Sequence, residues 1–186
     1  EGEAAGAERY VLGPLAKLVA PRLLRLQIPP RHLLLGATGM ALLGLALLAP
    51  GWKMLALLIF LLALTTNLVA DQISAMGRMT GNGGLIRLAP DMLVLAGVAW
   101  IGMQAGMPAD GLHLALLSAI AVVVLYRRER LTLPPWAYIT PGSAVFLLLA
   151  GVLSGLLPAA LALGAVLAIA SLAAVILVGG RADNGR

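Results

Sequence analysis

The sequence predicts an all-α integral membrane protein with six transmembrane helices preceded by an amphipathic interfacial helix. Of its 186 residues, 61% are hydrophobic and 11% are charged, whereas a typical soluble domain is about 45–50% apolar and about 25% charged. The hydrophobic residues form long runs separated by Gly and Pro, and the basic residues gather on one side of the membrane that these runs would cross. This composition excludes a water-soluble enzyme and a nucleic-acid-binding domain.

The chain begins with a linker or disordered tail, residues 1–7, followed by the expected interfacial helix, residues 8–27. The tail is small and acidic and does not resemble a signal peptide. We interpret it as a processed start or as the end of a linker from an upstream domain. Residues 8–27 carry apolar side chains at helical spacing, but basic residues interrupt them too often for a membrane crossing. Pro14 and Pro21 are expected to break or kink this helix.

Six apolar runs follow, and each is near the roughly 20 residues that one crossing requires. Turn residues such as Gly51 and Pro158 separate them. The fifth and sixth runs have almost no loop between them, which predicts a tight antiparallel pair. Residues 8–180 thus form one membrane domain, and residues 181–186 form a cytoplasmic tail. The six runs cover residues 32–49, 54–70, 88–105, 111–126, 137–157 and 159–178.

Two glycine pairs have the GxxxG spacing that permits two helices to approach closely. They are Gly102 with Gly106 and Gly151 with Gly155. The chain is rich in glycine, so we treat these pairs as weak predictions of helix contacts.

The distribution of basic residues predicts the orientation of the domain. With six crossings, the N-terminus, the second loop, the fourth loop and the C-terminus share one side, and 12 of the 13 Lys and Arg residues fall there. Lys53 is the one basic residue on the other side. Because Lys and Arg collect on the cytoplasmic side of membrane proteins, we expect both termini in the cytoplasm of a bacterial-type inner membrane. The same asymmetry accounts for the net charge of +5 without nucleic acid as a partner.

Polar residues of the predicted crossings concentrate in residues 65–91, where the second helix ends and the third begins. Four of them, spaced i, i+4, i+7 and i+11, share one face of the second helix: Asn67, Asp71, Ser74 and Arg78. On the third helix, Arg87 precedes Asp91 by one turn. The carboxylates of Asp71 and Asp91 are therefore expected at the same membrane depth.

Two interpretations of this stretch are open. In the first, ion pairs of Asp71 with Arg78, and of Asp91 with Arg87 or Arg78, hold the two helices together. In the second, the stretch forms a cytoplasm-facing pocket for an anionic headgroup or a cation. In that pocket Asp71 and Asp91 would bind a metal ion, Mg²⁺ or Mn²⁺, and Asp91 is the candidate catalytic residue. The candidate headgroup-binding residues are Arg78, Asn67, Ser74, Thr80 and Arg87.

Other metal chemistry is excluded by composition. The chain has no Cys and two His residues. Thiolate metal sites and His-rich zinc sites therefore cannot be built from it.

The same stretch resembles the CDP-alcohol phosphotransferase (CDP-alcohol phosphatidyltransferase) family, whose signature is D-x2-D-G-x2-A-R-x8-G-x3-D-x3-D. The anchor is Gly77-Arg78-Met79-Thr80-Gly81, where members commonly read A-R-x-T-G. Counting on from this anchor places Asp91 on the third aspartate of the signature without a gap. The resemblance implies six transmembrane helices behind an interfacial helix, a dimer, and a metal site at the cytoplasmic ends of helices two and three.

The signature is nevertheless incomplete, since Arg78 and Asp91 are the two of its eight positions that this chain keeps. The first, second and fourth aspartates are replaced by Ala70, Ile73 and Leu95. In the family, four carboxylates hold two divalent cations that bind the CDP diphosphate and stabilise the leaving group. Apolar side chains supply no metal ligand, so the residues present cannot assemble a two-metal site.

The leading hypothesis is therefore a non-catalytic subunit or domain related to phospholipid synthesis. It would lie among membrane lipids and pair with a second copy, a complete paralogue or an upstream fused domain. One alternative is an active phosphatidyltransferase with a rebuilt single-metal site. Another is a small lipid-binding or transport protein that uses the polar stripe as its pocket, although helices four to six contain almost no polar residues for a path across the membrane.

Overall fold

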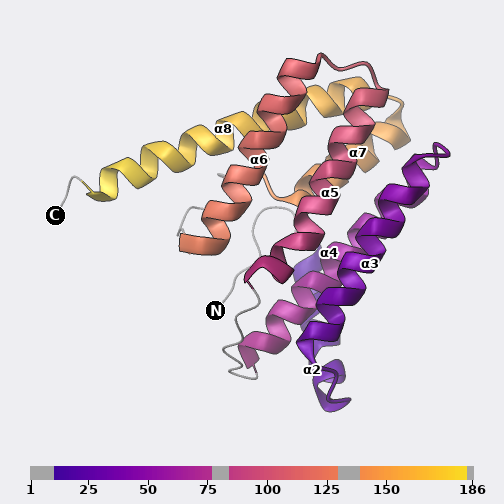
Figure 1. Ribbon diagram of the computed structural model, residues 1–186, viewed down its shortest axis with the longest axis vertical. Coiled ribbons are helices and arrows are strands. Elements are labelled where there is room, and N and C mark those ends of the chain that lie inside the picture. Colours follow the sequence, from indigo (N-terminus) through magenta and orange to yellow (C-terminus); the bar gives the residue numbers. More distant parts are fainter. Residues whose placement is uncertain (1–10, 77–83, 130–138, 184–186) are drawn as a thin grey trace.

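In a computed structural model, the chain is described over residues 11–76, 84–129 and 139–183, and its side chains over 11–76, 86–125 and 139–177. These parts contain seven helices and no strand, so the described chain is all-α as predicted. Figure 1 shows α3, α4 and α5 running alongside one another, with the end of α8 extending beyond the other helices. The helices are α2 (Leu12–Arg25), α3 (Pro30–Leu48), α4 (Lys53–Met76), α5 (Gly84–Gln104), α6 (Ala109–Glu129), α7 (Pro141–Ser154) and α8 (Leu157–Asp183).

The N-terminal helix α2 packs on the end of α4. Its alanines Ala16 and Ala20 are fully buried and contact Val69 and Ile73 of α4. Pro14 and Pro21 were predicted to break or kink this segment, and the structure shows no break, because α2 continues through Pro21. On the outer face of α2, leucines such as Leu15 and Leu18 are exposed, as expected for a helix in the membrane interface.

Helix α4 is longer than the apolar run that predicted it. It continues through the polar stripe to Met76, six residues beyond the expected end at residue 70. The polar side chains share one face of this extension, whereas Val69 and Ile73 on another face pack against α2. The apolar contact explains why the helix persists where the sequence becomes polar.

A single aromatic side chain joins α3, α4 and α5. Phe60 of α4 is fully buried, and it lies between Gly44 of α3 and Gly97 of α5. A Cβ atom added at Gly44 would come within 2.5 Å of the Phe60 ring, and one added at Gly97 would also overlap this ring. Glycine at both positions therefore makes room for the ring, which fixes how α4 lies against its two neighbours.

The two GxxxG pairs each combine a helix contact with a helix end. A Cβ added at Gly151 would lie 2.5 Å from the Cβ of Ala160, so α7 and α8 approach closely there. A Cβ added at Gly102 would lie 2.8 Å from Leu112 Cδ1 of α6. The second glycines, Gly106 and Gly155, have positive φ of 76° and 73°, the left-handed conformation that ends a helix. In each GxxxG pair, the first glycine therefore lies at a close helix contact and the second glycine lies at a helix end.

The apolar length of the helices makes this an integral membrane protein of the α-helical type. Four helices are long and apolar enough to cross a membrane: α3, α4, α5 and α8. In α6, an apolar segment of 17 residues extends from Ala109 to Leu125, and α7 has 14 residues. At 1.5 Å per residue, α7 spans about 21 Å, less than the roughly 30 Å of a bilayer core.

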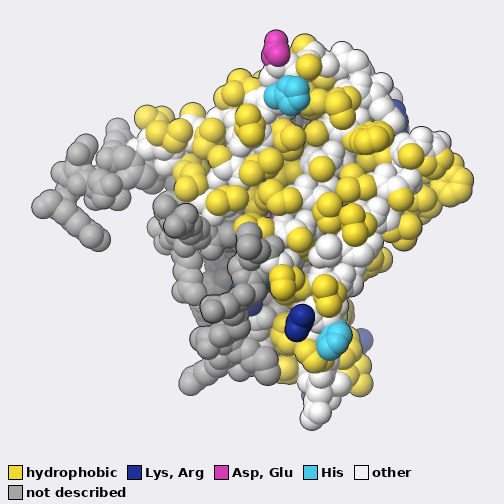
Figure 2. All heavy atoms as spheres, viewed as in Figure 1, with side chains coloured by type: hydrophobic (Ala, Val, Ile, Leu, Met, Phe, Trp, Pro, Cys, Tyr) yellow, Lys and Arg dark blue, Asp and Glu magenta, His cyan; other side chains and the backbone are white. Residues whose placement is uncertain are grey.

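The surface of the bundle agrees with this assignment. Figure 2 shows hydrophobic side chains over the body of the molecule, with charged and His side chains near its two ends. Large exposed hydrophobic residues occur on every one of these long helices, for example Leu42, Leu62, Trp100 and Leu177. Such a surface is expected where the surroundings are lipid.

Candidate functional site

The polar stripe of α4 faces the first half of α5. Asn67, Asp71 and Ser74 fall on one side of α4 because their spacing follows the helical repeat. Arg78 and Thr80 lie between the two helices in the sequence and fall outside the described residues. The contacts among Asn67, Asp71, Arg87 and Asp91, which we call the polar cluster, are therefore the part of the predicted site that the structure describes.

The innermost contact of the polar cluster is a hydrogen bond between two buried side chains. Asn67 is 2% exposed and Asp91 is 5% exposed. Asn67 Nδ2 donates to Asp91 Oδ1 at 3.1 Å and to the backbone carbonyl of Arg87 at 3.4 Å. An amide in apolar surroundings that binds both a carboxylate and a backbone oxygen fixes the rotation of α4 against α5.

One helical turn closer to the loop, the two helices are joined by an ion pair. Arg87 Nε lies 3.6 Å from Asp71 Oδ1, and the two side chains are 32% and 26% exposed. In this antiparallel pair residue 87 faces residue 71 where residue 91 faces residue 67, so Arg87 pairs with Asp71, a pairing that was not predicted. The two carboxylates consequently differ in depth by about one turn, roughly 6 Å along the helix. This corrects the expectation that they lie at the same depth.

Ser74 does not offer its hydroxyl proton to a ligand. Its Oγ is buried and donates to the backbone carbonyl of Ala70 at 2.8 Å. Thr65 and Thr66 donate in the same way to the carbonyls four residues before them. This bond within the helix is a common way for a hydroxyl to be satisfied in an apolar helix, so Ser74 contributes less to a pocket than its place on the stripe suggested.

The three positions at which this chain lacks an aspartate of the resembling signature are buried. Ala70, Ile73 and Leu95 are 0%, 3% and 4% exposed. Ile73 packs against the alanines of α2, and Leu95 packs against Ala119 and neighbouring apolar residues of α6 and α8. Within the part of the chain that the structure describes, no group of three or more His, Asp or Glu side chains is placed to hold a metal ion.

One oxygen of the polar cluster still lacks a donor. Asn67 Oδ1 is buried and has no hydrogen-bond partner among the described residues. An amide oxygen next to a carboxylate is a ligand that hard cations accept. Asp71, Asp91 and Asn67 therefore supply at most a partial set of ligands, and water would have to complete it.

A second set of polar contacts was not found from the sequence. The backbone N–H of Ile139, just before α7, donates to Ser171 Oγ of α8 at 2.8 Å, and Thr140 Oγ1 accepts from Ser143 N at 3.1 Å. A Thr followed by Pro is a typical start of a helix, so the cap at Thr140 could have been predicted. The bond to Ser171 depends on tertiary packing, which no local pattern indicates.

The fold and the polar cluster together define an α-helical integral membrane protein with buried polar contacts between α4 and α5. Comparison with family models, with curated proteins and with solved structures gave no match for this chain. The likeness to CDP-alcohol phosphotransferases thus rests on the short motif around Arg78 and on Asp91, and it enters the account as a proposal.

Proposed function

We propose that this chain is a non-catalytic membrane subunit or domain, related to the CDP-alcohol phosphotransferases, in which the polar cluster holds α4 against α5. The observation that carries this proposal is the burial of Ala70, Ile73 and Leu95 in apolar contacts. A two-metal site needs oxygen ligands at such positions. Here the same positions stabilise the packing of α2, α6 and α8 instead.

The contacts of the remaining polar groups support a structural role. Arg87 pairs with Asp71, and Asp91 accepts a hydrogen bond from Asn67. Each contact joins α4 to α5, and polar contacts between packed helices favour one arrangement of these helices. The same groups would have to release one another before they could bind a headgroup.

The topology that we propose has six crossings with both termini in the cytoplasm. Helices α6 and α7 would provide the two crossings beyond the four long apolar helices. Because α7 is shorter than the bilayer core is thick, it would lie nearly along the membrane normal. The excess of Lys and Arg on one side supports this orientation. A bacterial-type inner membrane follows from the family resemblance.

If this chain does not catalyse, the chemistry belongs to a partner. We propose that the chain pairs with a second copy, with a complete paralogue, or with a catalytic domain fused to it, and that the paralogue or the fused domain carries the chemistry. Membrane lipids would surround the exposed hydrophobic residues in each case.

A second candidate function is a phosphatidyltransferase with one metal ion. The buried Asn67 Oδ1 favours it, because this oxygen has no hydrogen-bond partner among the described residues and lies on the side chain that binds Asp91. Asp71 and Asp91 would hold Mg²⁺ or Mn²⁺ with water, and Arg78 would bind the diphosphate of the substrate. Asp91 would be the catalytic residue.

Thermal unfolding with and without ligand separates the two candidates. The purified protein is heated in detergent with CDP or CDP-diacylglycerol, each with and without Mg²⁺ or Mn²⁺, beside an Asp91→Asn variant. The non-catalytic proposal predicts that Mg²⁺ or Mn²⁺ changes the unfolding temperature with neither CDP nor CDP-diacylglycerol. A metal-dependent rise that is lost in Asp91→Asn would contradict it and support the single-metal enzyme, for which release of CMP is then measured.

A further inference from the structure

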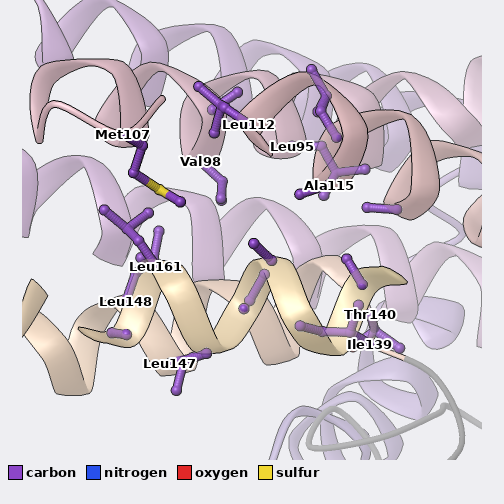
Figure 3. A pocket seen from close by; sticks show the side chains of 18 residues that line it. Leu95, Val98, Met107, Leu112, Ala115, Ile139, Thr140, Leu147, Leu148 and Leu161 are labelled. Carbon is purple, nitrogen blue, oxygen red and sulfur yellow. The ribbon is translucent and has the colours of Figure 1, made fainter. Parts of the chain in front are cut away.

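An apolar cavity lies between the α5–α6 pair and the α7–α8 pair, apart from the polar cluster. Figure 3 shows side chains from all four helices directed into it, among them Leu95, Leu112, Ala115 and Leu161. Its volume is about 60 Å³, and it is partly open at the surface of the bundle. Its residues on α5 and α8 fall within two of the helices that are long enough to cross a membrane, so the cavity lies at the depth of the lipid chains.

The side chains that line the cavity are almost all apolar, so they offer a polar ligand no hydrogen-bond partner. Of the eighteen residues that line the cavity, Thr140 is the one with a polar side chain. Its Oγ1 is already engaged by the hydroxyl of Ser143 at 2.9 Å and by the Ser143 backbone N–H. Water needs two or more polar partners to occupy a buried space, and an apolar cavity without them stays dry. The chemistry of the lining therefore favours an apolar ligand, a hydrocarbon, over water or a polar molecule.

Small residues create the space. The wall formed by α8 contains Ala160, Gly164, Ala165 and Ala168, and Ala115 and Ala119 face them from α6. These positions repeat along the helices at intervals of three or four residues, so the space is a slot that follows the helix axis. From residue 161 to residue 168 the slot extends about 10 Å at 1.5 Å per residue.

We propose that this slot binds one acyl chain of a membrane phospholipid. A chain in one leaflet is about 15 Å long, half of a hydrocarbon core of roughly 30 Å, so the slot takes part of one chain and leaves the rest of that chain and the headgroup outside. A second copy of the protein cannot enter, because a helix with its side chains is about 10 Å wide. Lipid chains are also the apolar molecules that surround the opening. This inference does not depend on the role of the polar cluster.

Photo-crosslinking in detergent tests the proposal. The probe is phosphatidylcholine with a diazirine in one acyl chain, added to delipidated protein at increasing concentration, and the labelled peptides are mapped by mass spectrometry. We expect labelling at residues 112–119 of α6 and 160–168 of α8 that saturates at one chain per protein and is removed by unlabelled phosphatidylcholine. A diazirine-bearing free fatty acid is tested in parallel, and labelling by it that phosphatidylcholine does not displace would overturn the assignment to a phospholipid.

Variants that fill the slot provide the control. Ala165→Leu fills it from α8 and Ala115→Leu from α6, whereas Ala162→Leu adds the same group on the exposed face of α8. We expect saturable labelling to fall roughly tenfold in Ala165→Leu and Ala115→Leu, because the added carbon atoms occupy the space of the acyl chain. Labelling of Ala162→Leu should equal that of the wild type. Thermal unfolding identifies any variant that fails to fold. Equal labelling of the folded slot variants, or wild-type labelling confined to exposed residues such as Leu114 and Leu163, would overturn the proposal.

Discussion

Asn67 and Asp91 form a hydrogen bond of 3.1 Å between Nδ2 and Oδ1, and both side chains are buried between α4 and α5. The amide also reaches the carbonyl of Arg87, whose side chain pairs with Asp71 one turn away. Two polar layers thus follow each other along the α4–α5 interface. Beyond them, Phe60 fills the space left by Gly97. The interface is therefore fixed by a ring at one end and by polar contacts at the other.

The two polar layers should differ in their contribution to stability. Asp71→Ala removes an ion pair that is about one-third exposed, and we expect it to lower the free energy of unfolding by less than about 1 kcal/mol. Asn67→Ala removes a fully buried donor and should cost about 1–3 kcal/mol. Unfolding by SDS in mixed micelles measures both values. A larger loss for Asp71→Ala than for Asn67→Ala would reverse the order that burial predicts.

Truncation of Phe60 should be among the most damaging single changes. Phe60→Ala leaves a cavity between Gly44 and Gly97, and we expect a loss of about 3–5 kcal/mol in the free energy of unfolding. Phe60→Leu keeps part of the volume and should lose less. The same SDS titration compares the variants. Equal stability of Phe60→Ala and the wild type would show that this ring does not join the three helices.

The glycines around this ring should tolerate no side chain. Gly97→Ala places a methyl group against Phe60 and should cost about 1–3 kcal/mol through overpacking. Gly36→Ala is the matched control, because a Cβ at Gly36 meets no atom within 4 Å. Alanine is the better helix former, so this control should be neutral or stabilising by up to about 1 kcal/mol. If both variants had the same unfolding free energy, close packing at Gly97 would be refuted.

Labelling of introduced cysteines tests the six-crossing topology. The chain has no native Cys, so each single-cysteine variant reports one position. In sealed, right-side-out cells, a membrane-impermeant maleimide should react with Lys53→Cys and Asp110→Cys, which the proposed topology places on the extracytoplasmic side. Arg25→Cys and Arg31→Cys should react after the membrane is permeabilised. Labelling of Arg31→Cys in intact cells would contradict the cytoplasmic position of the N-terminus.

Much of the fold followed from local patterns in the sequence. Hydrophobic runs indicated where the helices lie, because lipid requires each backbone polar group to be satisfied within its own helix. The end of the apolar run at residue 70 did not mark the end of α4, which continues to Met76 with Ile73 packed against α2, a helix far away in the sequence. The start of α7 at Pro141 came later than expected, and it coincides with the cap formed by Thr140.

The polar cluster was predictable in its members but not in its pairing. Helical spacing indicated that Asn67 and Asp71 share a face. It could not indicate that Asn67 faces Asp91 and Asp71 faces Arg87, because this register depends on how Phe60 packs between Gly44 and Gly97. The apolar slot escaped prediction for the same reason, as alanines on α6 and α8 create a space only when the helices come together.

The most direct test of a structural role for the polar cluster is a double-mutant cycle between Asn67 and Asp91. The variants Asn67→Ala, Asp91→Ala and the double variant are unfolded by SDS, and the coupling free energy is calculated from the three losses. Our account predicts a favourable coupling of about 0.6 kcal/mol or more in protein purified with EDTA, since hydrogen bonds between membrane helices average about 0.6 kcal/mol and reach about 1.7 kcal/mol. Losses that add to within about 0.3 kcal/mol would show that the two residues act independently and would contradict the account.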